Sequence, residues 1–402
     1  MQIRSASDSL KGYFYQFDKT ILTLLFADST NIITVEGIED IDIASPTLIT
    51  AIQCKYLESR AFTNSAIRKP ILLMLDHYIN NPQGYNYNLY TYFPHEATRK
   101  ETIDLDRLKD ILTYKETGKH TAYYKDKSIS DETLEKFLKC FQIQIGQSYD
   151  EQKQEVFKKI KEEFSCSDIE VEEIYYNKAL RFISDLAVLH NAEKRKTTKQ
   201  QLVNYLNCKE ILFNRWFFEL KGKEAYIKFI KRYVRAASLL KTQKEKFLFL
   251  SDKNFNKAHS MQIDQLLKNI VDKYFRLNKS LSDTKPWTVI FDIEQKKLTD
   301  IKKALVKANI KFNDGYEEIE FNKDIFNERP VINTNKSDKI INTSFFIKII
   351  LAETYKKHKK SIVNEDIVFF CSTKSPHDYF EKNINLIQIS MTSLEDINDI
   401  IN

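Results

Sequence analysis

The stretch Ile32-Ile-Thr-Val-Glu-Gly-Ile-Glu-Asp-Ile-Asp-Ile-Ala-Ser45 is followed within a few residues by Leu48-Ile-Thr-Ala-Ile-Gln-Cys-Lys-Tyr56. The Ser45-Pro46 connection between the two segments supplies a turn, because proline fixes φ and serine readily bonds its own backbone. The sequence therefore predicts a β-hairpin here, and the expected fold of the N-terminal region is built outward from it.

The side chains of a strand alternate between its two faces. We therefore expect Asp40 and Asp42 to share one face of the first strand, with Glu39 on the other face. Gln53 and Lys55 share a face of the second strand in the same way. An aspartate of one strand is then expected to face this glutamine and lysine on its neighbour.

This group of side chains suits the hydrolysis of a phosphodiester. The reaction needs a divalent cation, which polarises the phosphate and lowers the pKa of the attacking water, and a positive group beside the developing charge. Carboxylate and amide oxygens are suitable ligands for Mg²⁺. We expect an aspartate to be the main metal ligand, Gln53 to be an oxygen ligand or to hold a water, and Lys55 to stabilise charge. The alternative is a solvated sheet face, on which charged residues are common.

The elements around the hairpin favour the phosphodiesterase site over the solvated sheet face. Apolar residues from Leu10 to Leu25 follow the spacing of an amphipathic helix. A second helix is predicted from Ser65 to Asn80, in which Pro70 is tolerable only in the first turn. The alternation of aromatic and polar residues from Tyr85 to Phe93 predicts a further strand. The predicted order is helix, strands, helix, strand.

That order, together with an acidic residue and a Gln-x-Lys pair on the central strands, resembles the PD-(D/E)xK nuclease superfamily. More narrowly, Gly12-Tyr-Phe-Tyr-Gln16, Glu36, Glu39-Asp-Ile41 and Ile52-Gln-Cys-Lys-Tyr56 resemble the double-stranded-DNA endonuclease domain of bacterial anti-phage effectors. These domains occur in cyclic-oligonucleotide systems, in Lamassu-type systems and beside HerA-type ATPases. Glutamine commonly replaces the acid of the E-x-K half in this group, as in Mrr-type nucleases. The resemblance covers about the first 95 residues.

The resemblance implies a fold, a site and a cofactor. The fold is α/β, with a restriction-endonuclease-like αβββαβ core. The cofactor is Mg²⁺ or Mn²⁺, with Asp40 as the first choice of ligand, Asp42 as the alternative in register, and Gln53 as an oxygen ligand. Glu36 and Gln16 are second-line members, for which a solvated strand face and a helix-surface amide are the plainer interpretations. The residues that the resemblance assigns to the site are Gln16, Glu36, Asp40, Asp42, Gln53 and Lys55.

The resemblance also implies a biological role, which is that of a DNA endonuclease held inactive until a defence system is triggered. Control is then expected from the C-terminal part of the chain, from a partner ATPase of the SMC-like or HerA type, or from self-association. No Walker-type loop and no G-x-G-x-x-G occurs in the chain, so any ATP hydrolysis is expected from a partner. The competing hypothesis is a catalytically silent nuclease fold that binds DNA or acts as a scaffold.

Composition is compatible with these expectations without deciding between them. The chain has 402 residues, enough for two domains, and 62 Lys and Arg against 56 Asp and Glu give a mild net charge of +6. Five cysteines are scattered without a C-x-x-C pair, which favours free thiols in a reducing compartment. The N-terminus lacks the layout of a signal peptide, and no apolar run approaches the ~20 residues needed to cross a bilayer. We expect a cytoplasmic protein without membrane contact.

Beyond Phe93 we predict a helical elaboration that completes a first domain, 1–195. It includes helices over Asp150–Phe164 and Ile174–Leu189 and a strand that begins at Phe141. The basic run Glu193–Lys199 is the predicted boundary, with contact to DNA as a less favoured role.

The second predicted domain, 196–402, begins with helices up to about residue 280 and continues as a small α/β domain. The aromatic residues of Trp216–Tyr233 recur at helical spacing, and we expect them to form core in preference to stacking on bases. The predicted α/β elements are strands at Trp287–Ile293, Asp366–Cys371 and Ile384–Ile389 and helices at Phe345–Lys357 and Leu394–Ile401.

Overall fold

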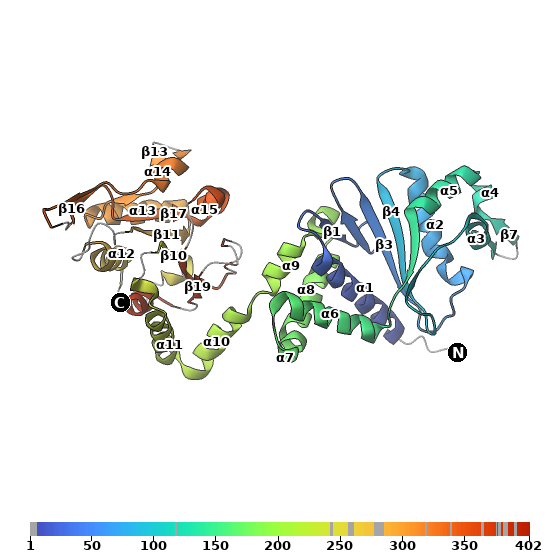
Figure 1. Ribbon diagram of the computed structural model, residues 1–402, viewed down its shortest axis with the longest axis horizontal. Coiled ribbons are helices and arrows are strands. Elements are labelled where there is room, and N and C mark those ends of the chain that lie inside the picture. The colour runs from blue at the N-terminus through green and yellow to red at the C-terminus, as the bar shows by residue number, and fades with distance from the viewer. Residues whose placement is uncertain are drawn as a thin grey trace. The chain divides into compact units, whose positions relative to one another are not determined.

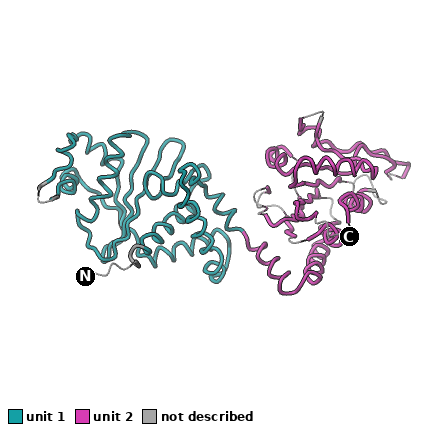
Figure 2. Tube along the Cα trace, turned by 180° about the vertical axis from the view of Figure 1, so that it is seen from behind, with its two compact units in different colours: residues 1–207 teal, residues 208–402 magenta. Residues whose placement is uncertain are grey.

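The structure is a computed structural model, and it describes residues 6–116, 119–241, 244–255, 261–276, 285–317, 320–337, 340–362, 366–374, 376, 379–380, 385–389 and 392–402. The chain divides into two compact units, unit 1 over residues 1–207 and unit 2 over residues 208–402 (Figure 2). Both units mix helices with strands, so the predicted α/β class is confirmed. Within the described ranges, no helix is both long enough and apolar enough to span a membrane.

Unit 1 begins with the predicted αβββαβ order (Figure 1). The first helix buries Ile21, Leu24 and Leu25 of its predicted apolar stripe, whereas Leu10, Tyr13 and Phe14 are exposed. The Ser45-Pro46 turn is closed by a hydrogen bond from the backbone N–H of Ser45 to the carbonyl of Leu48 at 2.9 Å. The core elements are α1 (Ala6–Phe26), β1 (Ile32–Val35), β2 (Ile41–Ala44), β3 (Ile49–Tyr56), α2 (Asn64–Asn80) and β4 (Tyr85–Tyr92).

These strands belong to a seven-stranded sheet with the order β5-β8-β4-β3-β2-β1-β9. Strand β3 is antiparallel to β2 and parallel to β4, so the hairpin is joined directly to the centre of the sheet. The remaining elements of unit 1 are β5 (Arg99–Glu101), α3 (Leu105–Ile111), β6 (Thr113–Glu116), β7 (Lys119–Ala122), α4 (Tyr123–Asp126), α5 (Asp131–Cys140), β8 (Phe141–Ile145), α6 (Tyr149–Phe164), α7 (Asp168–Glu170), α8 (Tyr176–Ala187), β9 (Lys196–Thr197) and α9 (Lys199–Leu206).

Helices cover both faces of this sheet. Helices α1, α6, α8 and α9 pack against one face, where Ile41, Ile52 and Cys54 contribute to the core. Helices α2, α3 and α5 pack against the other face, where Ala51 and Leu89 are buried. Alternate residues of β3 therefore enter different cores, as the period of a strand requires. Figure 1 shows the two helical layers on either side of the strands.

Three expectations for unit 1 need correction. Residues 36–40 form a loop, since β2 begins only at Ile41, so strand alternation does not govern Glu39 and Asp40. Pro70 lies in the interior of α2, beyond its first turn, and is buried there. The first unit ends after Asn207 and not at residue 195, because Lys196–Thr197 pairs with β1 as strand β9 and α9 adds buried leucines to the core of unit 1.

Unit 2 is built on a six-stranded sheet with the order β12-β17-β11-β10-β18-β19, in which every pair of neighbours is parallel. The central strands β10, β11 and β18 are mostly apolar and almost entirely buried, as expected of a sheet covered on both faces. Its elements are α10 (Lys209–Lys221), α11 (Lys223–Ala236), β10 (Lys246–Ser251), α12 (Ile263–Val271), β11 (Trp287–Asp292), α13 (Gln295–Lys307), β12 (Phe312–Asn313), β13 (Tyr316–Glu317), β14 (Glu320–Phe321), α14 (Lys323–Asn327), β15 (Ile332–Thr334), β16 (Ile340–Thr343), β17 (Ile347–Leu351), α15 (Ala352–His358), β18 (Ile367–Cys371), β19 (Asn385–Gln388) and α16 (Leu394–Ile401).

The small α/β domain predicted for this region is confirmed, with two corrections. The helix expected over Phe345–Lys357 is wrong in its first half, where Ile347–Leu351 is strand β17 between β11 and β12. Strand β10 lies inside the region predicted to be helical. A short, fully buried strand has no polar alternation, so its apolar run cannot be told from a buried helix segment by period alone.

The aromatic stripe of α10 and α11 is only partly core. Tyr226 is fully buried, in agreement with the expectation. Trp216, Phe229 and Tyr233 are exposed, and their side chains lie outside the core.

Candidate active site

The site predicted from the hairpin is centred on Asp40, the last residue of the loop before β2. Because Ile41 pairs with Ile52, Asp40 lies beside the next residue of β3, Gln53. The Oδ2 atom of Asp40 accepts a hydrogen bond from the backbone N–H of Cys54 at 2.7 Å and another from the Nε2 atom of Gln53. Within the described part of the chain, Asp40 Oδ1 and Gln53 Oε1 accept no hydrogen bond, so each residue keeps one hard oxygen atom available.

Asp42 is placed differently from Asp40. Its Oδ2 atom accepts a hydrogen bond from the backbone N–H of Ile38 at 2.7 Å, and its Oδ1 atom accepts one from Glu39 at 3.3 Å. The loop comes so close that a Cβ atom on Gly37 would lie 2.0 Å from the Asp42 carboxylate. The Asp42 carboxylate therefore accepts hydrogen bonds from the backbone N–H groups of the loop that carries Asp40, and it holds that loop in place.

Glu36 and Gln16 also meet at this loop. Glu36 follows β1 with a φ of 52°, in the left-handed region, and its backbone N–H donates to the carbonyl of Asp40 at 2.9 Å. Its Oε1 atom accepts a hydrogen bond from the Nε2 atom of Gln16, which reaches across from α1 and is 7% exposed. The structure thus brings Gln16 and Glu36 to the same place as Asp40, as the resemblance implies.

Lys55 provides positive charge at the site. Burial raises the pKa of Asp40, while the Cys54 N–H, the Lys55 ammonium and Gln53 act in the opposite direction. Burial and the negative charge of Asp40 raise the pKa of Glu36, and Lys55 also opposes this shift. Lys55 is therefore close enough to stabilise both carboxylates in their ionised forms.

Sequence reasoning missed two residues of this environment. Burial, followed by the charge of Asp40, raises the pKa of Glu39 to about 7, while Lys55 lowers it, so Glu39 belongs with the other carboxylates. The sequence predicts Glu39 on the strand face opposite Asp40, but Glu39 lies in a loop, where side chains do not alternate between two faces. Arg195, from the basic run predicted as a boundary, is the second. Its charge lowers the pKa of Glu36, and its buried Nε atom has no hydrogen-bond partner among the described residues.

The available ligands fit a hard cation that keeps part of its water shell. No group of three or more His, Cys, Asp or Glu side chains is arranged to hold a metal ion among the described residues. Mg²⁺, however, is usually bound through one or two carboxylates, several waters and the phosphate of the substrate. Asp40 Oδ1 and Gln53 Oε1 offer one carboxylate and one amide oxygen, with Glu36 and Glu39 nearby. This donor set suits Mg²⁺ or Mn²⁺ and does not suit a softer metal.

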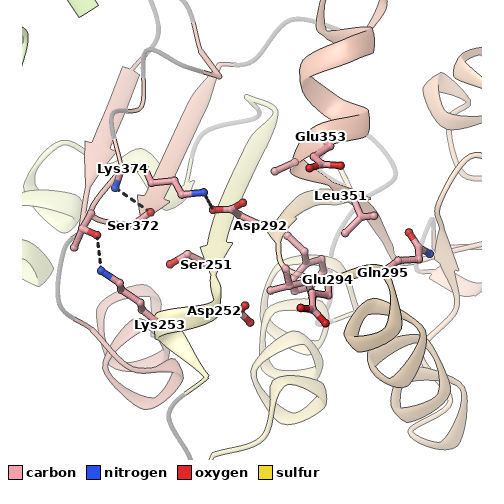
Figure 3. Close-up of a pocket in the computed structure, with 14 residues that line it drawn as sticks. Ser251, Asp252, Lys253, Asp292, Glu294, Gln295, Leu351, Glu353, Ser372 and Lys374 are labelled. Atoms are coloured by element: carbon pink, nitrogen blue, oxygen red, sulfur yellow. Dashed lines mark hydrogen bonds and ion pairs between the residues drawn. The ribbon is translucent and has the colours of Figure 1, made fainter. Parts of the chain in front are cut away.

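Unit 2 contains a cavity of about 540 Å³ at the carboxyl ends of β10, β11, β17 and β18. In open parallel sheets this edge is the usual place for a ligand. The charges around the cavity are partly paired, as Figure 3 shows for Lys374 and Asp292, whose atoms lie 2.7 Å apart. Asp252, on its rim, pairs with Lys297 at 2.7 Å. This cavity has no counterpart among the residues singled out from the sequence.

No protein-family model matches the chain, and no curated protein matches it. Similar solved structures include the Cap4 SAVED/CARF-domain containing receptor of Acinetobacter baumannii with the cyclic trinucleotide 2'3'3'-cAAA, with 13% identity and a TM-score of 0.31. That match covers 70% of this chain and 61% of the receptor, so the chain spans about three fifths of the receptor's length. The same receptor without a named ligand matches at 11% identity and a TM-score of 0.31, with 92% of this chain and 91% of the receptor covered.

The Cap4 SAVED/CARF-domain containing receptor of Moraxella osloensis matches at 11% identity and a TM-score of 0.30, with 94% of this chain and 82% of the receptor covered. TM-scores this low support no inference about the fold or the function of the chain.

Proposed function

We propose that unit 1 is a Mg²⁺-dependent endonuclease that hydrolyses phosphodiesters of double-stranded DNA. The observation that carries the proposal is the pairing of Asp40 with the backbone N–H of Cys54 and the amide of Gln53, at a place where Lys55 acts on the same carboxylate. These are the groups that the resemblance to PD-(D/E)xK nucleases assigns to catalysis.

Each residue has a role that follows from its contacts. The bound cation would supply a polarised phosphate and a more acidic water. Asp40 would hold the cation through Oδ1, because its Oδ2 atom is already engaged. Gln53 orients Asp40 with its Nε2 atom and leaves Oε1 for the cation or a water. Lys55 would neutralise the charge that develops on the phosphate. Glu36, fixed by Gln16, would complete the acidic side of the site.

Between the two candidate ligands, the hydrogen bonds favour Asp40. Both carboxylate oxygens of Asp42 accept hydrogen bonds from the backbone of the loop, whereas only Oδ2 of Asp40 is engaged among the described residues. Asp42 is then a support of the loop.

The wider role that we propose is that of an effector in a bacterial anti-phage defence system, as the resemblance of the first 95 residues implies. Unit 2 would regulate the nuclease or assemble it, and a SMC-like or HerA-type ATPase, a homo-oligomer or both would complete the active form. The cavity at the carboxyl edge of the unit 2 sheet offers this unit a place for a small ligand. The second candidate is a silent nuclease fold that binds DNA, because the described residues include no group of three or more His, Cys, Asp or Glu side chains arranged to hold a metal ion.

The test incubates the full chain with linear and with supercoiled circular DNA, alone and with any ATPase encoded beside it. We expect cleavage of both substrates in Mg²⁺ or Mn²⁺ and none in EDTA. Retention of DNA in a gel-shift assay without cleavage under every metal condition would contradict the nuclease and support the silent fold.

A further inference from the structure

Helices α10 and α11 of unit 2 present aromatic rings that the core does not cover. Their exposed large apolar side chains are Phe213, Trp216, Leu220, Phe229 and Tyr233. The two helices meet at Gly222, whose φ of 80° favours glycine, and Figure 1 shows the sharp turn between them. Single exposed apolar residues are common, but a group of them on consecutive helices marks an interaction site. We call these five side chains the ring face.

The members of the ring face form one surface, because ring contacts link the two helices. The ring centroids of Phe213 and Phe229 lie 5.9 Å apart, and those of Phe217 and Phe229 lie 5.0 Å apart. Trp216 follows one turn after Phe213, and Tyr233 follows one turn after Phe229. Trp216 is 51% exposed and Tyr233 is 53% exposed, and neither has a ring partner among the described residues. Both rings can therefore receive a planar group from outside.

A stripe of positive charge runs beside the ring face. Helix α11 has five Lys or Arg residues and one Glu. Four of these cations recur at the i, i+3, i+4 and i+7 spacing, which places them on one side of the helix: Lys228, Lys231, Arg232 and Arg235. Tyr233 follows Arg232 directly in the chain, so this cation stripe borders the ring face.

The cation stripe lacks the acidic partners that other helices supply. Among the described residues, Lys228, Lys231 and Arg232 form no ion pair. In α5, α8 and α10, by contrast, a basic residue pairs with an acidic residue four positions away. Like charges at this spacing destabilise a helix. Burial lowers the pKa of Lys273, and the positive charges of Arg235 and Lys231 lower it further. A polyanion along the stripe would relieve this repulsion.

From the ring face and the cation stripe together, we infer that α10 and α11 bind single-stranded DNA. Bases stack on exposed aromatic rings, while Lys and Arg neutralise the phosphates between them. A base offers its face for stacking only when the strand is unpaired, so a single strand is favoured over a duplex. An acidic peptide would engage the cations and leave the rings without a planar partner. The choice of DNA over RNA rests on the proposed nuclease, whereas the binding of a single strand rests on α10 and α11 alone.

Fluorescence anisotropy of the full chain in EDTA tests this inference, with a labelled DNA strand of about 16 nucleotides as the probe. Duplex DNA and RNA of the same sequence are the comparison ligands. We expect the single strand to bind about tenfold more tightly than the duplex, because only its bases can stack. The logarithm of the affinity should fall with the logarithm of salt concentration with a slope of about −2, as three phosphate contacts predict. No binding, or tighter binding of duplex or RNA, would overturn the inference.

Variants of the ring face test stacking. Tyr233→Leu and Trp216→Leu, which keep apolar side chains but remove the rings, should each weaken binding of the single strand by about tenfold. Tyr233→Trp should bind at least as tightly as the parent. Tyr205→Leu, at a 40% exposed tyrosine of α9, is the matched control and should bind like the parent. If Tyr233→Leu does not fold, Trp216→Leu carries the test. Parental affinity in the folded variants would overturn the inference.

Variants of the cation stripe test the phosphate contacts separately. Arg232→Gln should reduce the steepness of the salt dependence by about 0.7, whereas Tyr233→Leu should leave it unchanged. Lys307→Gln, at an exposed lysine of α13, is the matched control for charge. An unchanged slope in Arg232→Gln would contradict the role of the cation stripe.

Two further measurements test other occupants of the ring face. Flotation with vesicles of phosphatidylcholine and phosphatidylserine tests an anionic membrane, and light scattering tests a second copy of the chain. Vesicle binding or self-association that is lost in Tyr233→Leu, with unchanged affinity for the single strand, would assign the ring face to that occupant and overturn the inference.

Failure of this inference is distinguishable from failure of the proposed nuclease, because binding is measured in EDTA, without metal-dependent cleavage. A parent protein that binds the single strand but cuts no DNA would contradict the nuclease and support the binding face. A parent protein that cuts duplex DNA in Mg²⁺ but does not bind the single strand would contradict the binding face alone.

Discussion

The two units of the chain treat acidic residues in different ways. At the Asp40 loop of unit 1, the negative charge of Asp40 acts on two further carboxylates, Glu36 and Glu39. At the cavity of unit 2, two of the four acidic lining residues, Asp252 and Asp292, each have a lysine of their own at 2.7 Å. A carboxylate that is already paired with a lysine has little net charge left to attract a cation. The first arrangement is poised to attract a cation, and for that reason we place the chemistry in unit 1.

The largest expected effect separates two aspartates of the hairpin. Asp40→Asn should lower Mg²⁺-dependent DNA cleavage by about 10³-fold or more, because it removes the proposed anionic ligand of the cation. Asp42→Asn should retain cleavage but lower the free energy of unfolding by about 1 kcal/mol, since it weakens hydrogen bonds to the loop. A cleavage assay combined with urea unfolding measures both. Equal loss of cleavage in both variants, at equal stability, would contradict the distinction.

Arg195 should have a smaller effect on the same reaction. Its positive charge acts on Glu36, so Arg195→Ala is expected to lower cleavage by about tenfold, whereas Arg195→Lys should recover most of the rate. Lys194→Ala, a neighbouring exposed lysine, serves as the control. Cleavage rates under single-turnover conditions measure this effect. Identical rates for Arg195→Ala and Lys194→Ala would show that Arg195 does not contribute to cleavage.

The acidic character of the loop also predicts a dependence of stability on pH. The pKa of Glu39 is raised from 4.5 to about 7, so its stabilising contribution is complete below pH 4.5 and is lost as the pH rises towards 7. Relative to the parent, Glu39→Gln should therefore gain stability across this window, by on the order of 1 kcal/mol at pH 8 after allowance for solvent screening. Urea unfolding in EDTA at pH 4.5 and pH 8 measures the difference, which would be absent if Glu39 were a solvated side chain.

The smallest expected effect is the loss of stability on breaking an ion pair at the unit 2 cavity. Lys374→Met removes the partner of Asp292, but Lys374 is 54% exposed, so the expected loss of stability is about 0–1 kcal/mol. Thermal unfolding of the parent and the variant at low and high salt tests this value. A loss well above that range would show that the pair is a structural link of the sheet edge and not a screened surface pair.

Much of the N-terminal fold could be predicted from the sequence, because its elements carry clear periods. The spacing of the apolar residues defined α1, and the turn residues Ser45-Pro46 separated β2 from β3. The buried strands β10 and β17 could not be predicted, since both of their faces are covered and no alternation remains.

The candidate site was predicted in part for similar reasons. The Gln53-x-Lys55 pair lies on a regular strand, where alternation holds, and the structure brings it to Asp40. Glu39 and Asp40 lie on a loop, so their positions depend on the hydrogen bonds of Asp42 and not on a strand period. Arg195 reaches Glu36 only because β9 adds to the far edge of the sheet, which is a contact between distant parts of the chain.

The most direct test of the central claim is the cleavage of supercoiled plasmid by Lys55→Ala in Mg²⁺, beside the parent and Lys158→Ala. We predict that Lys55→Ala loses about 10²–10³-fold of the cleavage rate while its circular dichroism and unfolding midpoint stay unchanged, and that Lys158→Ala cuts like the parent. Cleavage by folded Lys55→Ala at the parental rate would contradict the assignment of Asp40, Gln53 and Lys55 as the catalytic site.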